Sequence, residues 1–325
     1  MALALFAPWV AEYLVGSHTV LDLPLIVFLV PLYGGGAVLV REVARHLGGG
    51  WPAILLLGLA YGVIEAGLVD QSMFNPDYLG EDFQSIAHVD GAGISAFWAL
   101  AFVVGHAVWS VGVPVAVVES FGGRLRDEPW TSRPVLLLIA AVYAVGCWLV
   151  FSDLQAGEHF MAAPAQLAAA GLVAAALVAA AVGLRHRDRR ARRPLVPGRA
   201  ARLLPGPPPW PVVLVLSFVV SFVLWRPGSW VGVALSVALL ALAAVAVRQW
   251  SASRRWSPMH VLAVAGGALV TYAVNGYSLH PWHRVSPGVE LASDTAFAVV
   301  AVALVVLTLW RQGRRQSGRP GRRYS

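Results

Sequence analysis

The sequence has few charged residues for its length and contains no lysine. Only 13% of its 325 residues are charged, 58% are hydrophobic, and the mean hydropathy is +0.68. A soluble domain carries roughly 25% charged residues because water must cover its surface, so a soluble enzyme and a disordered chain are both excluded. Cys147 is the single cysteine, which excludes a disulfide-stapled secreted scaffold. A polytopic membrane protein remains.

The chain also lacks the common catalytic signatures. It has no Walker loop, no G-x-S-x-G elbow, no H-E-x-x-H motif and no clustered metal-ligand spacing. The sequence therefore names no cofactor and leaves metal dependence open.

Long apolar runs take up most of the chain. A helix needs about 20 apolar residues to cross a hydrocarbon core of ~30 Å, and in lipid its backbone groups must pair within the segment. We therefore predict an all-α, polytopic transmembrane helix bundle of about nine spans, with eight to ten as the range. The predicted spans are 21–40, 51–71, 94–119, 134–152, 162–184, 210–225, 229–247, 258–279 and 291–310.

The basic residues, all of them arginine, indicate an orientation. Taking the connections alternately, one set holds 22 of the arginines and the other holds only Arg226 and Arg284. By the positive-inside rule the first set is cytoplasmic. This predicts a multi-pass protein of the cell membrane with its N-terminus outside and its C-terminus in the cytoplasm.

The composition also divides the chain. Residues 1–20 are apolar but too short to span, which predicts an outer interfacial segment, although insertion as a further span stays open. Residues 21–184 form a five-span bundle, 185–209 an Arg/Pro-rich cytoplasmic linker, 210–311 a four-span bundle and 312–325 a basic cytoplasmic tail. The arginine segments predict contact with anionic lipid. They carry no interleaved aromatic residues for base stacking, so no nucleic-acid partner is expected.

Polar residues inside the spans are the candidates for function, because an ionisable side chain in hydrocarbon is costly unless it is paired or faces water. Glu65 lies in the second span, ~15 Å from the outer end if the helix reaches Asn75 and only ~6 Å if it stops at Val69. On the same helix Tyr61 lies one turn from Glu65 and could donate to it, and Asp70 follows at the outer end. Gly58 and Gly62 form a small-xxx-small pair that permits close approach of a neighbouring helix.

Two other spans carry polar groups at helical spacing. His106 is the histidine in the middle of the third span, and Ser110 follows it on the same face. Pro114 removes the backbone bond that the Ser110 carbonyl would accept. Thr271 and Asn275 give the eighth span a polar stripe. These groups could meet within the bundle.

The Glu-bearing helix YGVIEAGLVD (61–70), followed by Phe102-x-x-x-His106, resembles the CPBP intramembrane proteases, the CAAX-processing and bacteriocin-processing family. In that family a membrane-embedded Glu and His activate water for peptide hydrolysis, on motifs written EExxxR, FxxxH and HxxxN or HxxxD. The resemblance implies catalytic roles for Glu65 and His106. The chain departs from the pattern at the second Glu and at the Arg, which are Ala66 and Asp70. It departs again in the third motif, where Thr271-x-x-x-Asn275 has Thr in place of His.

Three interpretations stand. A hydrolase-like membrane protein, or a degenerate relative of one, needs Glu65 and His106 within hydrogen-bond reach around one water. A carrier or receptor for a small solute needs a wider cavity and broken helices, for which Pro31 and Pro114 are candidates. In a non-catalytic scaffold the two residues would only hold helices together. The sequence identifies neither a small-molecule nor a peptide partner.

Overall fold

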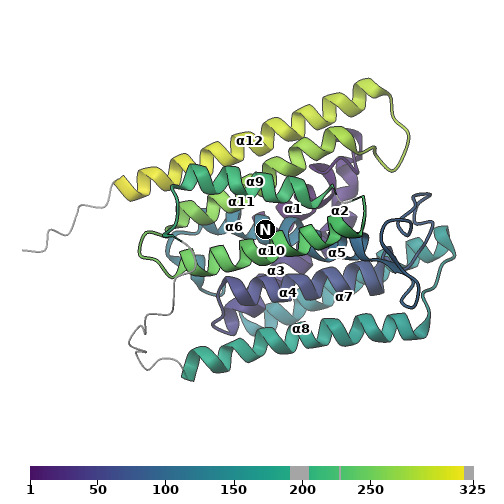
Figure 1. Ribbon diagram of the computed structural model, residues 1–325, viewed down its shortest axis with the longest axis horizontal. Helices are drawn as coiled ribbons and strands as arrows, with labels where there is room; N and C mark the ends of the chain where they lie inside the picture. The colour runs from purple at the N-terminus through teal and green to yellow at the C-terminus, as the bar shows by residue number, and fades with distance from the viewer. Residues whose placement is uncertain (191–204, 227, 318–325) are drawn as a thin grey trace, which may run out of the picture.

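The computed structural model describes residues 1–190, 205–226 and 228–317, and it is a bundle of helices (Figure 1). Within this part of the chain, eight helices are long and apolar enough to cross a membrane. The predicted span 210–225 forms a helix of 15 residues, Trp210–Leu224, and is the short one. The all-α transmembrane prediction is therefore confirmed, at the lower end of its range.

The helices and turns are given in chain order. The α-helices are α1 (Ala2–Pro8), α2 (Ile26–Leu29), α3 (Gly35–His46), α4 (Trp51–Ile64), α5 (Ala96–Gly105), α6 (Val113–Phe121), α7 (Arg133–Glu158), α8 (Pro164–Arg190), α9 (Trp210–Leu224), α10 (Trp230–Ser251), α11 (Pro258–Asn275) and α12 (Pro287–Ser317). The π-helical segments are η1 (Trp9–Tyr13), η3 (Val30–Gly34), η4 (Glu65–Val69) and η5 (His106–Gly112). The 3-10 turns are η2 (Val20–Leu25), η6 (Gly123–Asp127) and η7 (Gly276–Ser278), and the strands are β1 (His88–Val89) and β2 (Ile94–Ser95).

The two ends of the bundle differ in chemistry. One end, here named the loop end, carries residues 71–95, 159–163 and 279–286, including the antiparallel β1–β2 hairpin. The other, named the arginine end, carries the connections 47–50, 122–132 and 252–257 together with the C-terminal end of α12 (Figure 1). Among the described residues, this end carries Arg126, Arg254, Arg255 and Arg311, as the span assignment requires.

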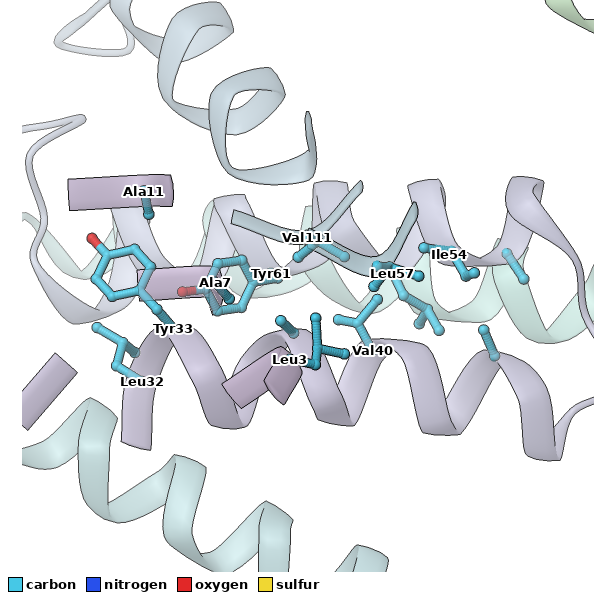
Figure 2. Packing of buried hydrophobic residues seen from close by; sticks show 14 of the residues in the cluster. Leu3, Ala7, Ala11, Leu32, Tyr33, Val40, Ile54, Leu57, Tyr61 and Val111 are labelled. Carbon is cyan, nitrogen blue, oxygen red and sulfur yellow. The ribbon is translucent and has the colours of Figure 1, made fainter. Parts of the chain in front are cut away.

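The N-terminal segment does not lie on the surface, as an interfacial segment over residues 1–20 would. Leu3, Ala7, Val10 and Tyr13 are all buried. Figure 2 shows Leu3, Ala7 and Ala11 in the same hydrophobic cluster as Tyr33 and Tyr61. This burial differs from the surface position expected of residues 1–20, because a helix too short to span alone can still be stabilised by burying its apolar residues among other helices.

The two predicted bundles share one core. A single hydrophobic cluster joins the N-terminal segment, η5 and α6 to α11 and α12. Within it the Trp109 ring stacks on Tyr272 at 4.3 Å between centroids, and its indole N–H donates to the Ala268 carbonyl over 2.8 Å.

The predicted linker and tail are partly helical. Residues 185–190 continue α8, and 312–317 continue α12. Residues 191–204 of the linker and 318–325 of the tail lie outside the described residues. The five-part division of the chain remains a prediction.

Candidate functional site

Glycines bring the helices of Glu65 and His106 into close contact. A Cβ on Gly62 of α4 would lie only 2.7 Å from the Val103 carbonyl oxygen and 3.1 Å from the His106 Cβ. A Cβ on Gly58 would lie 3.2 Å from the Ala107 Cα. The small-xxx-small pair therefore packs against α5 and η5 as expected, and one turn further along α4 the Glu65 side chain faces His106.

The central contact joins a carboxylate and an imidazole. His106 Nε2 lies 2.5 Å from Glu65 Oε2. Tyr33 donates its hydroxyl to the other carboxylate oxygen, Oε1, over 3.1 Å. The other ring nitrogen of His106, Nδ1, lies 3.0 Å from Ser110 Oγ. Tyr33 and Ser110 thus hold the far side of each group, whereas the Glu65–His106 contact is a close ion pair without hydrogen-bond geometry, since Glu65 Oε2 has no hydrogen-bond partner in the described residues.

Glu65 and His106 differ in how much of each residue is exposed. Glu65 is 2% exposed, whereas 16% of the His106 side chain is accessible. His106 is therefore the less buried member of the pair.

Five polar residues in or beside this cluster lie on π-helical segments. Glu12 belongs to η1, Tyr33 to η3, Glu65 to η4, and His106 and Ser110 to η5. All four segments close with a backbone bond spanning five residues, as in the bond from the Asp70 N–H to the Glu65 carbonyl over 3.0 Å. Such wide turns are rare in helices and occur frequently at functional sites. Their convergence on one polar cluster is the strongest structural sign of function in the described residues.

Proline explains two of these turns. Pro114 lies two residues beyond the end of η5 and has no N–H to donate to the Ser110 carbonyl, so the regular bond cannot form there. Pro8 directly precedes η1 and leaves the Ala4 carbonyl without its helical donor. Gly34 of η3 packs on that carbonyl so closely that a Cβ would lie 2.1 Å from the oxygen. The N-terminal segment and η3 therefore cross at a point that tolerates only glycine.

Two more carboxyl groups flank the pair. Glu12 interacts electrostatically with Tyr33, Glu65 and His106. Asp70 interacts electrostatically with the same two residues, and it accepts from the Ser72 N–H over 2.9 Å. Both flanking residues are half-buried. The site thus combines three carboxyl groups with one imidazole.

The structure brings only some of the predicted residues together. Ser110 and Asp70 belong to the cluster, but Tyr61 does not donate to Glu65: its hydroxyl has no hydrogen-bond partner in the described part of the chain. The Tyr61 ring instead packs edge-on against His106, with 5.7 Å between centroids.

Thr271 and Asn275 do not contact the Glu65–His106 pair. The Thr271 hydroxyl reaches the carbonyl oxygens of Gly267 at 3.1 Å and Phe218 at 3.3 Å, which ties α11 to α9. Over the described residues, neither Thr271 nor Asn275 has a hydrogen bond or ion pair with Glu65 or His106. The third motif of the resemblance is therefore not part of this cluster.

Sequence reasoning missed Tyr33 and Glu12. In the sequence Tyr33 resembles an ordinary interfacial aromatic residue of an apolar span, and no neighbouring motif indicates a functional role. Glu12 did carry a signal, because it is the single charged residue of an otherwise apolar segment, 2–15. An acid inside a buried helix requires a partner, and Tyr33 supplies it.

The helix of Glu65 ends at Val69, so the shallower of the two expected positions applies. Glu65 is nevertheless buried, because Met73 and Phe74 of the following loop fold back and pack with Val63 and Ala66. Glu65 is therefore buried by the loop that covers it and not by a deep position along the span.

A second buried polar cluster lies toward the arginine end. Arg41 and Arg45, expected in a solvated connection, belong to α3 and are buried. Arg45 Nη2 lies 2.7 Å from Glu119 Oε2, and Arg41 Nε lies 3.0 Å from Glu119 Oε1. Arg41 also pairs with Glu42, whose second oxygen accepts from the backbone of 130–131. Because every charge here has a partner inside the protein, this cluster holds α3, α6 and the connection 122–132 together.

No group of three or more histidine, cysteine or acidic side chains is placed to hold a metal ion in residues 1–190, 205–226 and 228–317. The polar cluster therefore offers hydrogen-bonding and proton-exchanging groups as its own chemistry.

Comparison with known proteins gives the class of the protein. The chain belongs to an uncharacterized membrane protein family, whose family model matches residues 1–317. No curated protein and no solved structure matches the chain. The protein is thus an integral membrane protein by both fold and family, and the resemblance to the CPBP proteases is unconfirmed.

Proposed function

We propose that Glu65 and His106 form the acid–base centre of a membrane-embedded hydrolase. The observation that carries this proposal is the 2.5 Å contact between Glu65 Oε2 and His106 Nε2, with Tyr33 and Ser110 holding the far side of each group. A base held within hydrogen-bond reach of an acid, and oriented by further groups, is what general acid–base catalysis requires. The partial match to the CPBP motifs at the same two residues agrees with this reaction class.

The chemistry needs one water at the accessible edge of His106. The Glu65–His106 pair removes a proton from that water as its oxygen attacks the substrate carbonyl carbon. The same proton then passes to the leaving amine when the carbon–nitrogen bond breaks. Because the cluster lies among apolar helices, the fitting substrate is a peptide bond in or beside the membrane.

A second candidate is a proton-coupled carrier. The observation that favours it is the pair of additional carboxyl groups, Glu12 and Asp70, on either side of Glu65. Chains of acidic and histidine side chains within membrane spans often serve as proton relays in transporters.

The test uses the purified full-length protein in lipid nanodiscs with a set of fluorogenic membrane-peptide substrates. Glu65→Gln and His106→Ala should each lower turnover about 10²–10⁴-fold, the usual contribution of a general acid or base. The double variant should lose little more than either single one, since two groups that act as a unit are not additive.

The chain offers a matched control pair. His280 and Glu290 lie 2.7 Å apart near the loop end, with His280 87% exposed. His280→Ala and Glu290→Gln should leave turnover unchanged. A wild-type protein that cleaves no peptide, yet carries protons in proteoliposomes in a Glu65-dependent way, would replace the hydrolase with the carrier.

A further inference from the structure

An apolar groove runs along α12, which lies at one edge of the bundle (Figure 1). The groove has a volume of about 730 Å³, and it is lined by α12 from Thr295 to Trp310 and by Tyr277 of η7. The α12 residues that line it recur at every third or fourth position, so they form one stripe along the helix. Val299 and Val306 of this stripe are 62% and 61% exposed. The stripe therefore faces the surroundings of the bundle and not its core.

The length of the groove matches one leaflet of a membrane. Thr295 and Trp310 are 15 positions apart, or ~22 Å at the rise of a helix. The hydrocarbon core is ~30 Å thick, so the acyl chains of one leaflet extend over ~15 Å. Tryptophan is typical of the membrane–water interface, which places the Trp310 end of the groove at the level of the headgroups. An acyl chain that enters there fits along the groove.

An arginine lies where the groove reaches this interface. Arg314 follows Trp310 by one turn, so it continues the same stripe of α12. Its guanidinium carbon lies over the Trp310 ring, 4.1 Å from the centroid. A guanidinium group presents paired N–H donors that match the oxygens of a phosphate. The groove thus combines an apolar channel with a phosphate-binding group at one end.

We propose that the α12 groove binds one anionic phospholipid, with an acyl chain along the stripe and the headgroup phosphate on Arg314. The charge at the end of the groove favours this occupant over a second copy of the chain. Two copies in one membrane have the same orientation, and a two-fold contact across this face would bring their Arg314 side chains to the same end. Like charges there would repel, whereas an anionic headgroup compensates the arginine. The site is independent of the proposed chemistry of Glu65 and His106.

The experiment is native mass spectrometry of the full-length protein in detergent, titrated with phosphatidylglycerol or phosphatidylcholine of identical acyl chains. The first phosphatidylglycerol should bind about fivefold more tightly than the first phosphatidylcholine, the factor that corresponds to about 1 kcal/mol for one arginine near a membrane surface. Arg314→Gln should remove this difference and leave phosphatidylcholine binding unchanged. Ala303→Trp should abolish the tight binding step for both lipids, because an indole at this lining position fills the groove.

The same helix offers a matched control for each variant. Arg315→Gln makes the same change of charge one position further on, but Arg315 Nη1 donates to the Ser120 carbonyl oxygen of α6 over 2.9 Å and so points away from the groove. Ala296→Trp is the control for Ala303→Trp, because Ala296 is an exposed residue of α12 that does not line the groove. Both control variants should bind the two lipids as the wild type does.

The outcomes distinguish a defined lipid site from its alternatives. Equal affinity of the wild type for the two lipids would overturn the proposal, and so would an equal loss of phosphatidylglycerol binding in Arg314→Gln and Arg315→Gln, which indicates diffuse attraction by the arginine end. A dimer that Ala303→Trp dissociates while phosphatidylglycerol binding stays unchanged would assign the groove to a second copy and overturn the lipid site. If Ala303→Trp does not fold, the comparison of Arg314→Gln with Arg315→Gln still decides the test.

Discussion

A single carboxylate, Glu119, compensates two buried positive charges inside the bundle, those of Arg41 and Arg45. Glu119 is the carboxylate that meets both guanidinium groups, and it is buried with them. A buried ion pair contributes little compared with apolar packing, but removing one partner leaves an uncompensated buried charge.

The first prediction therefore concerns Glu119. Glu119→Gln keeps the shape and removes the charge, so it should destabilise the protein by about 3–5 kcal/mol. Asp127→Asn is the control, because Asp127 lies 3.5 Å from the same Arg45 but is 69% exposed, and an exposed pair is worth about 0–1 kcal/mol. Thermal unfolding in one detergent measures both. Equal shifts for the two variants would mean that burial does not set the strength of this cluster.

A second prediction at this scale concerns His18, in the connection between η1 and η2. Its Nδ1 is buried without a hydrogen-bond partner in the described residues, and burial lowers the pKa of His18 from its usual 6.5, with Asp22 opposing and His283 reinforcing the shift. The unfolded chain therefore takes up a proton near pH 6.5 that the folded chain accepts only at lower pH. The contribution of neutral His18 to the free energy of unfolding is therefore fully present above pH 6.5, and it is lost as the pH falls below that value.

His18→Phe should make the melting temperature less dependent on pH between about 8 and 5, since the ring contact with Tyr13 is kept and the titrating group is lost. His280→Phe, at an exposed position, should leave the dependence as in the wild type. A steeper loss of stability in His18→Phe at low pH would contradict this account.

At the scale of elements, the wide turns decide where the polar groups point. The same residues on regular α-helices would be rotated relative to one another, because each π-helical segment holds one more residue per hydrogen-bonded loop than an α-turn. The crossing of the N-terminal segment over η3 positions both Glu12 and Tyr33, and it depends on Gly34.

Gly34→Ala should displace the N-terminal segment, because its Cβ would lie 2.1 Å from the Ala4 carbonyl oxygen. We expect a loss of about 1–3 kcal/mol, the usual cost of overpacking, and faster proteolysis within residues 2–13. Gly171→Ala is the control: nothing lies within 4 Å of that position in α8, and alanine there should be neutral or gain about 0.5–1 kcal/mol. Proteolysis and thermal unfolding of the two variants give the comparison, and a stable Gly34→Ala protein would refute the close crossing.

At the scale of the whole molecule, the arginine asymmetry remains although Arg41 and Arg45 are buried pairs. Within the described residues, Arg126, Arg254, Arg255 and Arg311 still lie at the arginine end, away from the loop 71–95 (Figure 1). The orientation itself stays a prediction of the positive-inside rule.

Thiol labelling checks the orientation. In a Cys147→Ser background, Ser85→Cys in the loop end and Ser251→Cys at the arginine end are both exposed positions. A membrane-impermeant reagent should label Ser85→Cys in intact cells and should label Ser251→Cys only after lysis. The opposite pattern would invert the topology and place the accessible edge of His106 toward the cytoplasm.

The sequence by itself determined the membrane class, most of the spans and the two residues at the centre of the candidate site. These follow from properties of short segments: an apolar run long enough to cross lipid, and the cost of an unpaired ionisable group such as Glu65 or His106 within such a run. Gly58 and Gly62 could be interpreted in the same way, because close helix approach needs only small residues at one spacing.

The tertiary structure decided which polar groups meet. Glu12 and Tyr33 join the site, and Thr271 and Asn275 do not, because the choice depends on which helix packs beside η4 and η5. The burial of residues 2–13 and the pairing of Arg41 and Arg45 with Glu119, 78 and 74 positions away, depend on neighbours that are distant in the chain. Hydropathy measures the cost of placing each segment in lipid, whereas these contacts arise from the shapes of helices that have already been inserted.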